Sequence, residues 1–221
     1  MVNLGEVFPN FSANTSEGRI EKFHDWIGDD SWAILFSHPA DYTPVCTTEL
    51  ARVVTLVPEF RKKNVKLIAL SCDSVESHKG WGKDVLHYAG SKQEKLPYPI
   101  IADEKRELAV QLGMIDPDEI DKQGLPLTAR AVFIIGPDKK LKLSILYPAT
   151  TGRNFDEILR VIDSLQLTAT KKVATPVDWK SGKECMVLPT VSNEEAKTLF
   201  PNMKTVQLPS GKEYLRLTPQ P

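Results

Sequence analysis

The sequence predicts an α/β fold in which a central mixed sheet is flanked by helices. Two nearly continuous apolar runs of strand length, residues 32–36 and 65–71, have the composition of strands buried on both faces. A segment with helical apolar spacing follows the first run. Turn-forming residues at 136–140 separate two further strand-like runs, which is typical of a hairpin. Strand–helix–strand units followed by a hairpin indicate a layered α/β structure.

The N-terminal half of the chain contains the two buried strands and their helices. Residues 1–31 are turn-rich and predict short extended pieces rather than a long helix. A helix is predicted from Pro44 to about Lys63, with Pro58 expected to kink it. After the second strand, Asp73 or Ser74 is expected to cap a helix that reaches about Tyr88. The helix expected to begin at Pro44 carries one apolar face, formed by Leu50, Val53, Val54, Val57 and Phe60.

The C-terminal half completes a thioredoxin-like arrangement and adds a small extension. The expected elements are a strand at 99–102, a short helix at 106–112, a loop at 113–128, hairpin strands at 131–135 and 141–147, and a helix from Phe155, capped by Asn154, to about Thr168. Residues 1–169 therefore form the predicted main domain, and residues 170–221 a small C-terminal domain.

The predicted C-terminal domain begins with a linker at residues 170–176. A strand at 185–188, a helix after the capping-box residue Ser192 and a strand at 214–217 are expected to follow. So short a segment builds little core alone. We therefore expect it to pack on the main domain or on a partner subunit.

Composition excludes several classes of function. The 28 basic and 29 acidic residues give a net charge of −1, which offers no nucleic-acid or anionic-membrane footprint. The three cysteines form no Cys-x-x-Cys pair, and the four histidines lack metal-ligand spacing, so no metal site is expected. With no signal-like start and no apolar run long enough to span a bilayer, a cytoplasmic protein without an integral membrane segment is expected.

Cys46 is the candidate nucleophile. Thr43 and Pro44 predict a helix start, with Thr43 as the N-cap and Pro44 as the first helical residue. Cys46 then lies in the first turn, where free N–H groups and the positive end of the helix dipole favour thiolate over thiol. The Thr43 hydroxyl is expected to face the Cys46 N–H and to reach its sulfur. The alternative is a buried, inert helix cysteine.

The residues around Cys46 resemble those of a known family. Pro39, Thr43 and Cys46 match the Pro-x-x-x-Thr-x-x-Cys motif of the peroxiredoxins, thiol peroxidases on a thioredoxin-like fold. The longer words at 37–39 and 43–50 resemble the one-cysteine, peroxiredoxin 6-type branch. The resemblance extends over essentially the whole chain, through words at 68–71, 96–97, 130–133, 147–155 and 174–179.

This resemblance implies a thiol peroxidase that acts on hydrogen peroxide and organic hydroperoxides, including lipid hydroperoxides, in antioxidant defence. Cys46 would attack the peroxide and become a sulfenic acid. Thr43 would hydrogen-bond the sulfur and the peroxide, Pro39 would shield the thiolate from water, and Arg130 would lie beside it. An arginine that opens a buried strand favours this role chemically, and the alternative is an ordinary surface ion pair.

Three further residues are candidates for a supporting role. Glu49 and Arg153 resemble the family's second ion-pair layer, and the alternative for each is a solvated surface charge. His38 directly precedes the motif and is close enough in sequence to approach the sulfur, although a histidine at a strand end is more often structural.

The remaining cysteines, Cys72 and Cys185, are expected to be packing residues. Cys185 lacks the Val-Cys-Pro word that surrounds the resolving cysteine of two-cysteine relatives. The sulfenic acid would therefore be reduced by an external thiol. The resemblance implies glutathione, delivered with a glutathione S-transferase, and a homodimer, with no cofactor.

Two other functions are kept as alternatives. Peroxiredoxin 6-type proteins are also described as calcium-independent phospholipases A2 that use Ser, His and Asp, and the matching positions are Ser31, His24 and Asp138. The word at residues 28–33 departs from their Gly-x-Ser-x-Gly pattern, and Ser31 and Asp138 also suit ordinary turns. A redox-switched chaperone or thiol sensor would oxidise Cys46 without fast turnover.

Overall fold

The computed structural model describes residues 2–221 and divides the chain into two compact units, Met1–Arg153 and Asn154–Pro221. We predicted a division after residue 169. The structure instead groups the helix α5 (Phe155–Thr170) with the C-terminal unit, in which it packs against the short strand β10 (Val173–Ala174). None of the helices formed by residues 2–221 has the length and apolar character needed to cross a bilayer.

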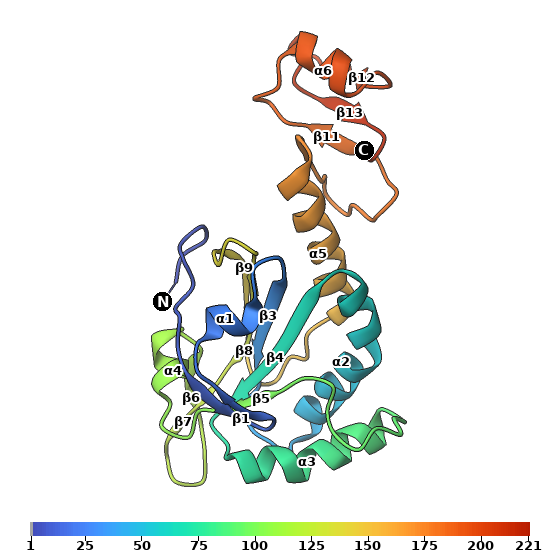
Figure 1. Ribbon diagram of the computed structural model, residues 1–221. Coiled ribbons are helices and arrows are strands. Elements are labelled where there is room, and N and C mark those ends of the chain that lie inside the picture. The colour runs from blue at the N-terminus through green and yellow to red at the C-terminus, as the bar shows by residue number, and fades with distance from the viewer. Residues whose placement is uncertain (1) are drawn as a thin grey trace. The chain divides into compact units, whose positions relative to one another are not determined.

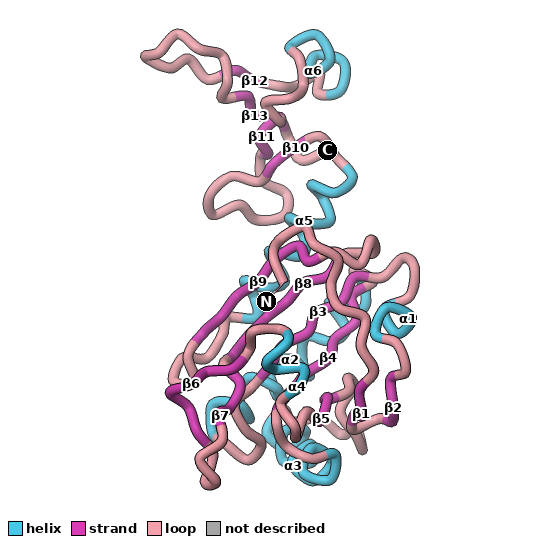
Figure 2. Tube along the Cα trace, turned by 90° about the vertical axis from the view of Figure 1, so that its left-hand side faces the viewer, coloured by secondary structure: helices cyan, strands magenta, loops and turns pink. Residues whose placement is uncertain are grey.

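A seven-stranded mixed sheet forms the centre of the N-terminal unit (Figures 1 and 2). Its strands are β1 (Ala13–Thr15), β2 (Gly18–Ile20), β3 (Trp32–Ser37), β4 (Val65–Ser71), β5 (Ile100–Ala102), β8 (Arg130–Ile135) and β9 (Leu141–Tyr147), in the order β2-β1-β5-β4-β3-β8-β9. β3 pairs in parallel with β4 and antiparallel with β8, and every residue of β3 and β8 is buried. The predicted mixed sheet, its buried strands and the hairpin formed by β8 and β9 are confirmed.

Four helices accompany this sheet: α1 (Phe23–Ile27), α2 (Pro44–Lys62), α3 (Val75–Tyr88) and α4 (Glu107–Gln111). α2 begins at Pro44 and contains Pro58, and α3 is capped by Ser74, whose Oγ accepts a hydrogen bond from Ser77 N. Both helices therefore begin where the sequence predicted. α2 and α3 contact each other, and their N-terminal ends lie close together near the lower edge of Figure 1.

Alternation along the strands sends side chains to opposite faces of the sheet. Odd-numbered residues of β3 and β8 join one apolar cluster with α1 and α4, which includes the tilted ring pairs that Phe8 forms with Phe23 and Phe133. Even-numbered residues such as Phe36 and Val132 point to the other face. α2 buries Cys46 together with its apolar side chains. The sheet therefore separates the cluster around Phe8 from the side that holds Phe36.

The segment 113–128 differs from the loop that we predicted. It contains a two-stranded sheet of β6 (Ile115–Ile120) and β7 (Pro126–Thr128) with an irregular register. β6 has the sequence IDPDEI and is half-buried to exposed, so it shows neither a continuous apolar run nor a clean alternation. Such a strand leaves no periodic signal in the sequence.

The C-terminal unit has a small core of its own. Besides α5 and β10 it contains β11 (Cys185–Val187), α6 (Asn193–Leu199), β12 (Lys204–Thr205) and β13 (Arg216–Thr218), with the sheet order β10-β11-β13-β12. The predicted linker at 170–176 thus includes a strand. Trp179, Cys185 and Phe200 belong to one buried apolar cluster, and Ser192 caps α6 as predicted. The expectation that this segment packs on the main domain or on a partner subunit stays a prediction.

Candidate active site

Cys46 is the third residue of α2 and its side chain is completely buried. β3 ends at Ser37, the connecting segment 38–43 carries Pro39, and Thr43 is the N-cap residue with extended backbone angles. Pro39 is itself buried. The sulfur therefore lies in the first helical turn, among N–H groups that have no partner within the helix. The positive end of the helix dipole lies at this position.

Arg130 brings a positive charge to the sulfur. It is the first residue of β8, which pairs with β3, and its Nη1 lies 3.3 Å from Cys46 Sγ. Its Nε and Nη2 both donate to the carbonyl oxygen of Ala149, at 2.9 and 2.6 Å. These bonds fix the plane of the guanidinium. A fixed, fully charged donor at this distance stabilises a negative sulfur more than a neutral one.

Glu49 lies one turn after Cys46 and holds two arginines. Its Oε2 accepts from Arg130 Nη1 and from Arg153 Nη2, both at 2.7 Å. Its Oε1 accepts from the Nε of Arg153 at 2.9 Å and from the backbone N–H of Arg153 at 2.7 Å. Burial alone would raise the pKa of Glu49, but the hydrogen bonds and charge of Arg153, with the charge of Arg130, hold it below its usual value. Because two arginines share this carboxylate, it offsets only part of the Arg130 charge.

The side chain of Arg153 is fixed against the central sheet. Its Nη1 donates to Ala131 O at 2.6 Å, and its guanidinium lies over the ring of Phe36 at 5.8 Å from the centroid. Phe36 belongs to β3 and Ala131 to β8, so the two paired strands position the arginine. The structure thus brings Cys46, Glu49, Arg130 and Arg153 together in one buried group.

Thr43 is the N-cap residue of α2, but its side chain does not cap the helix. Its hydroxyl donates to Ala40 O at 2.8 Å and makes no hydrogen bond to the first-turn N–H groups. The expected bond to the Cys46 N–H is therefore a wrong prediction. The segment 38–43 turns sharply enough to bring the Ala40 carbonyl within reach of the hydroxyl, and a hydroxyl proton goes to the nearest good acceptor.

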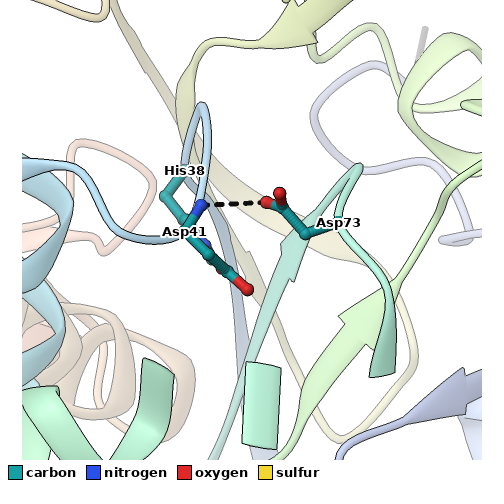
Figure 3. A group of neighbouring side chains, drawn as sticks. All are labelled: His38, Asp41 and Asp73. Atoms are coloured by element: carbon teal, nitrogen blue, oxygen red, sulfur yellow. Dashed lines mark hydrogen bonds and ion pairs between the residues drawn. The ribbon is translucent and has the colours of Figure 1, made fainter. Parts of the chain in front are cut away.

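Asp41 anchors the segment that precedes α2, and no pattern in the sequence singled it out. Its carboxylate accepts from His38 Nε2 at 2.9 Å, His78 Nδ1 at 2.7 Å and Ser77 Oγ at 2.8 Å. Its own N–H donates to Asp73 Oδ2 at 2.9 Å, the bond drawn in Figure 3. Burial would raise the pKa of Asp41, but the bonds from His38 and His78 hold it well below its usual value. We call this group of five residues the Asp41 clamp: His38, Asp41, Asp73, Ser77 and His78.

Three residues of the Asp41 clamp lie close enough together to bind a metal ion. One ligand atom each of His38, Asp41 and Asp73 lies within 4.8 Å of the others. His38 Nε2 and Asp41 are already paired with each other, and Asp73 Oδ2 accepts from Asp41 N and from Ser71 Oγ. Of the buried side-chain N and O atoms in residues 2–221, His38 Nδ1 alone has no hydrogen-bond partner. We interpret the group as a hydrogen-bonded anchor, in which His38 bonds Asp41 rather than the sulfur.

Comparison with known proteins then identifies the family. The AhpC/TSA family model matches residues 4–144, and the model of the C-terminal domain of 1-Cys peroxiredoxin matches residues 164–202. The chain belongs to the 1-Cys peroxiredoxins. Peroxiredoxin-6 of Gallus gallus is 70% identical over 220 residues, which cover 99% of this chain and 97% of that protein.

Solved structures agree with this assignment. A cysteine-to-serine mutant of the peroxiredoxin 6 of Arenicola marina matches with a TM-score of 0.97 and 69% identity, covering 100% of this chain and 99% of that one. A yeast mitochondrial 1-Cys peroxiredoxin matches with a TM-score of 0.89 and 45% identity, covering 99% of this chain and 100% of that one. The predicted thioredoxin-like fold and the resemblance to the one-cysteine branch are confirmed, and this peroxiredoxin is a peroxidase.

The other two cysteines of this peroxiredoxin lie in different surroundings. Burial raises the pKa of the half-buried Cys72 thiol to about 12, and Arg106 only partly opposes this effect. Burial also raises the pKa of Cys185, which belongs to the core cluster of the C-terminal unit. Both thiols therefore stay protonated near neutral pH and are poor nucleophiles.

The three residues that match a phospholipase triad bond to other partners. Ser31 Oγ donates to Asn64 Oδ1 at 3.0 Å, His24 Nε2 is 2.7 Å from Phe8 O, and Asp138 Oδ2 pairs with Lys142 Nζ at 2.6 Å. Within residues 2–221, no hydrogen bond joins any two members of the proposed triad. Their assignment stays a prediction from the resemblance.

Proposed function

We propose that this peroxiredoxin reduces hydrogen peroxide and organic hydroperoxides, including lipid hydroperoxides, through a sulfenic acid at Cys46. The supporting observation is the 3.3 Å contact between Arg130 Nη1 and Cys46 Sγ. The thiolate forms a bond to the terminal peroxide oxygen while the O–O bond breaks. The released oxygen leaves as water or an alcohol after taking a proton. The electron pair comes from sulfur, so the step needs no cofactor.

The buried residues around the sulfur have separate roles in this proposal. Arg130 stabilises the thiolate and the charge that develops on the leaving oxygen. Glu49 and Arg153 hold Arg130 in place. Pro39 excludes water from the sulfur, and Thr43, one turn before it, directs the peroxide. His38 acts through its hydrogen bond to Asp41. This bond anchors the segment 38–43, which carries Pro39 and Thr43.

A fast reaction with peroxide tests this role of Cys46. We expect Cys46→Ser to abolish peroxide reduction. A rate close to that of a free thiol would favour the thiol-sensor or chaperone alternative, because neither needs fast turnover. Phospholipase activity is tested separately by Ser31→Ala, which leaves Cys46 in place.

We propose glutathione as the external reductant, delivered with a glutathione S-transferase. The similar yeast mitochondrial 1-Cys peroxiredoxin resolves its thiol through glutathione and thioredoxin systems. In the present chain, Cys72 and Cys185 have raised pKa values and are therefore poor resolving thiols. Turnover with glutathione, with and without a glutathione S-transferase, tests both parts of this proposal. Turnover with thioredoxin alone would contradict it.

We also propose that the protein is a cytoplasmic homodimer. β9 is an edge strand of the central sheet, and Leu146 and Tyr147 on it are 58% and 37% exposed. An open edge with exposed apolar side chains is a template for pairing with a second chain. Sedimentation of wild type and of Leu146→Glu tests the dimer, which the charge should weaken. Imaging of a tagged full-length protein tests the location.

A further inference from the structure

His78 is a buried histidine of α3 whose two ring nitrogens both face hydrogen-bond acceptors. Its Nδ1 lies 2.7 Å from Asp41 Oδ2, and its Nε2 lies 3.2 Å from Ile101 O. A carboxylate and a backbone carbonyl can only accept hydrogen bonds. A neutral imidazole carries one N–H and can satisfy one of these acceptors, whereas an imidazolium carries two and satisfies both. The contacts of His78 therefore suit the charged ring.

His38, the other histidine of the Asp41 clamp, has contacts that suit a neutral ring. Its Nε2 lies 2.9 Å from Asp41 Oδ1, but its Nδ1 is buried and has no hydrogen-bond partner. A proton on Nδ1 would leave an N–H group buried without an acceptor, which is costly. Of the two histidines that bond Asp41, only His78 has an acceptor for a second proton.

Asp41 needs a positive charge beside it. Its carboxylate is 1% exposed, and a buried charge is costly unless it is paired. Within residues 2–221, its ion-pair partners are His38 and His78. Asp73 Oδ2 accepts from the Asp41 N–H and brings a second carboxylate close to the same group. The balance of charge therefore also calls for one cationic histidine.

The other charged groups near His78 lie toward solvent. Together with His78 they line a pocket between α3 and the segments before β2 and β5, and all are exposed: Glu17, Lys79, Lys83, Glu94 and Lys95. Water and salt screen exposed charges much more than buried ones. The buried carboxylate of Asp41 is therefore the dominant charge that the His78 ring meets.

We propose that His78 is held as an imidazolium cation and is a positioning residue for the peroxide reaction. Its buried ion pair with Asp41 joins α3 to the segment 38–43, which carries Pro39 and Thr43. This inference rests on the proposed function, in which Pro39 excludes water and Thr43 directs the peroxide. Without the charge of His78, the buried Asp41 carboxylate loses its compensation, and the segment loses its anchor on α3.

NMR of the histidine ring nitrogens tests the charge directly. Long-range proton–nitrogen correlation separates a ring with two N–H groups from each neutral tautomer. At about pH 8, above the range in which an exposed histidine titrates, His78 should still carry both protons. His38 should be neutral with its proton on Nε2, and the exposed His87 should be neutral. A neutral His78 ring at this pH would overturn the inference.

Stopped-flow kinetics test the positioning role. His78→Gln should slow the reaction of Cys46 with hydrogen peroxide by about tenfold or more, because misplacement by about 1 Å costs up to roughly a hundredfold. His87→Gln is the matched control, since His87 is an exposed residue of the last turn of α3, and it should keep the wild-type rate. A wild-type rate in His78→Gln would overturn the positioning role.

A double variant distinguishes loss of the charge pair from general damage. Removing one partner of a buried ion pair leaves an uncompensated charge, whereas removing both does not. Asp41→Asn/His78→Gln should therefore slow the reaction by less than the product of the two single effects. Effects that simply multiply would contradict an ion pair. If the wild type itself reacts slowly with peroxide, the proposed function fails, and the NMR result still decides the charge of His78.

Discussion

The Nη1 atom of Arg130 lies 3.3 Å from the sulfur of Cys46, across a separation of 84 residues in the chain. One residue opens β8 and the other lies in the first turn of α2, so the pairing of β8 with β3 brings them together. Both side chains are buried. The stabilisation of a thiolate therefore depends on the packing of regular elements rather than on a mobile loop.

The first prediction concerns the carboxylate that holds this arginine. Glu49→Gln removes the charge that pairs with Arg130 and Arg153, and both guanidinium groups stay buried. We expect a loss of about 3 kcal/mol of stability or more, as is typical when one partner of a buried ion pair is removed. The peroxide rate should fall as Arg130 loses its support. Urea unfolding and stopped-flow kinetics measure the two effects.

Glu59→Gln is the control for that variant. Glu59 lies on the same helix, is half-exposed and pairs with Lys62 at 2.8 Å near the surface. Pairs of this kind contribute roughly 0–1 kcal/mol. If Glu49→Gln behaved like Glu59→Gln in both assays, the buried ion-pair group would have no role in the reaction.

The second prediction concerns Arg130 itself. Arg130→Gln should slow the reaction of Cys46 with peroxide by about a hundredfold, the usual cost of removing one donor from developing charge. Arg130→Lys keeps the charge but loses the fork that bonds both Ala149 and Glu49, so we expect an intermediate rate. The rate constants come from stopped-flow mixing. Equal rate constants for Arg130→Gln and Arg130→Lys would show that the positive charge at position 130 contributes little to the reaction.

The third prediction separates the three cysteines. Cys72→Ser and Cys185→Ser should keep most of the peroxidase activity, because burial raises the pKa of both thiols and leaves them protonated near neutral pH. Steady-state turnover with glutathione is the assay. A large loss in either variant, without loss of folded protein, would indicate a resolving role for that cysteine.

The fourth prediction is a dependence of stability on pH. The folded-state pKa of Asp41 is lowered, and the unfolded value of an aspartate is about 3.9. Its contribution to stability is therefore complete above about pH 5 and is lost as the pH falls. Asp41→Asn should lower the free energy of unfolding at pH 7 and make the acid side of the stability curve flatter. Urea unfolding between about pH 7 and about pH 2 measures both, because the contribution is lost mainly below the unfolded pKa.

Asp118→Asn provides the comparison for Asp41→Asn. Asp118 is an exposed residue of β6, and its replacement should leave the stability curve almost unchanged. The same acid slope in wild type and in Asp41→Asn would contradict the assignment of the clamp as a charged anchor.

Much of the fold could be predicted because its signals are local. β3 and β4 are continuous apolar runs, α2 begins at the Thr43–Pro44 pair, and α3 begins after the cap Ser74. Each of these follows from adjacent residues. β6 could not be predicted, because its polar, half-exposed sequence carries no period that distinguishes a strand from a loop.

The site was only partly accessible to sequence reasoning. Cys46 follows from its place in a predicted first helical turn, whereas Arg130 and Arg153 needed the family resemblance, since only the sheet register brings them to α2. The Asp41 clamp depends on how the first turn of α3 faces the segment before α2.

The most direct test of the central claim is the reaction of the reduced protein with a small excess of hydrogen peroxide. Stopped-flow mixing gives the rate of thiol loss, and trapping with mass spectrometry locates the sulfenic acid. We predict the loss of one thiol at a rate far above that of a free cysteine, with the sulfenic acid at Cys46. Slow loss, or oxidation shared among Cys46, Cys72 and Cys185, would contradict the account.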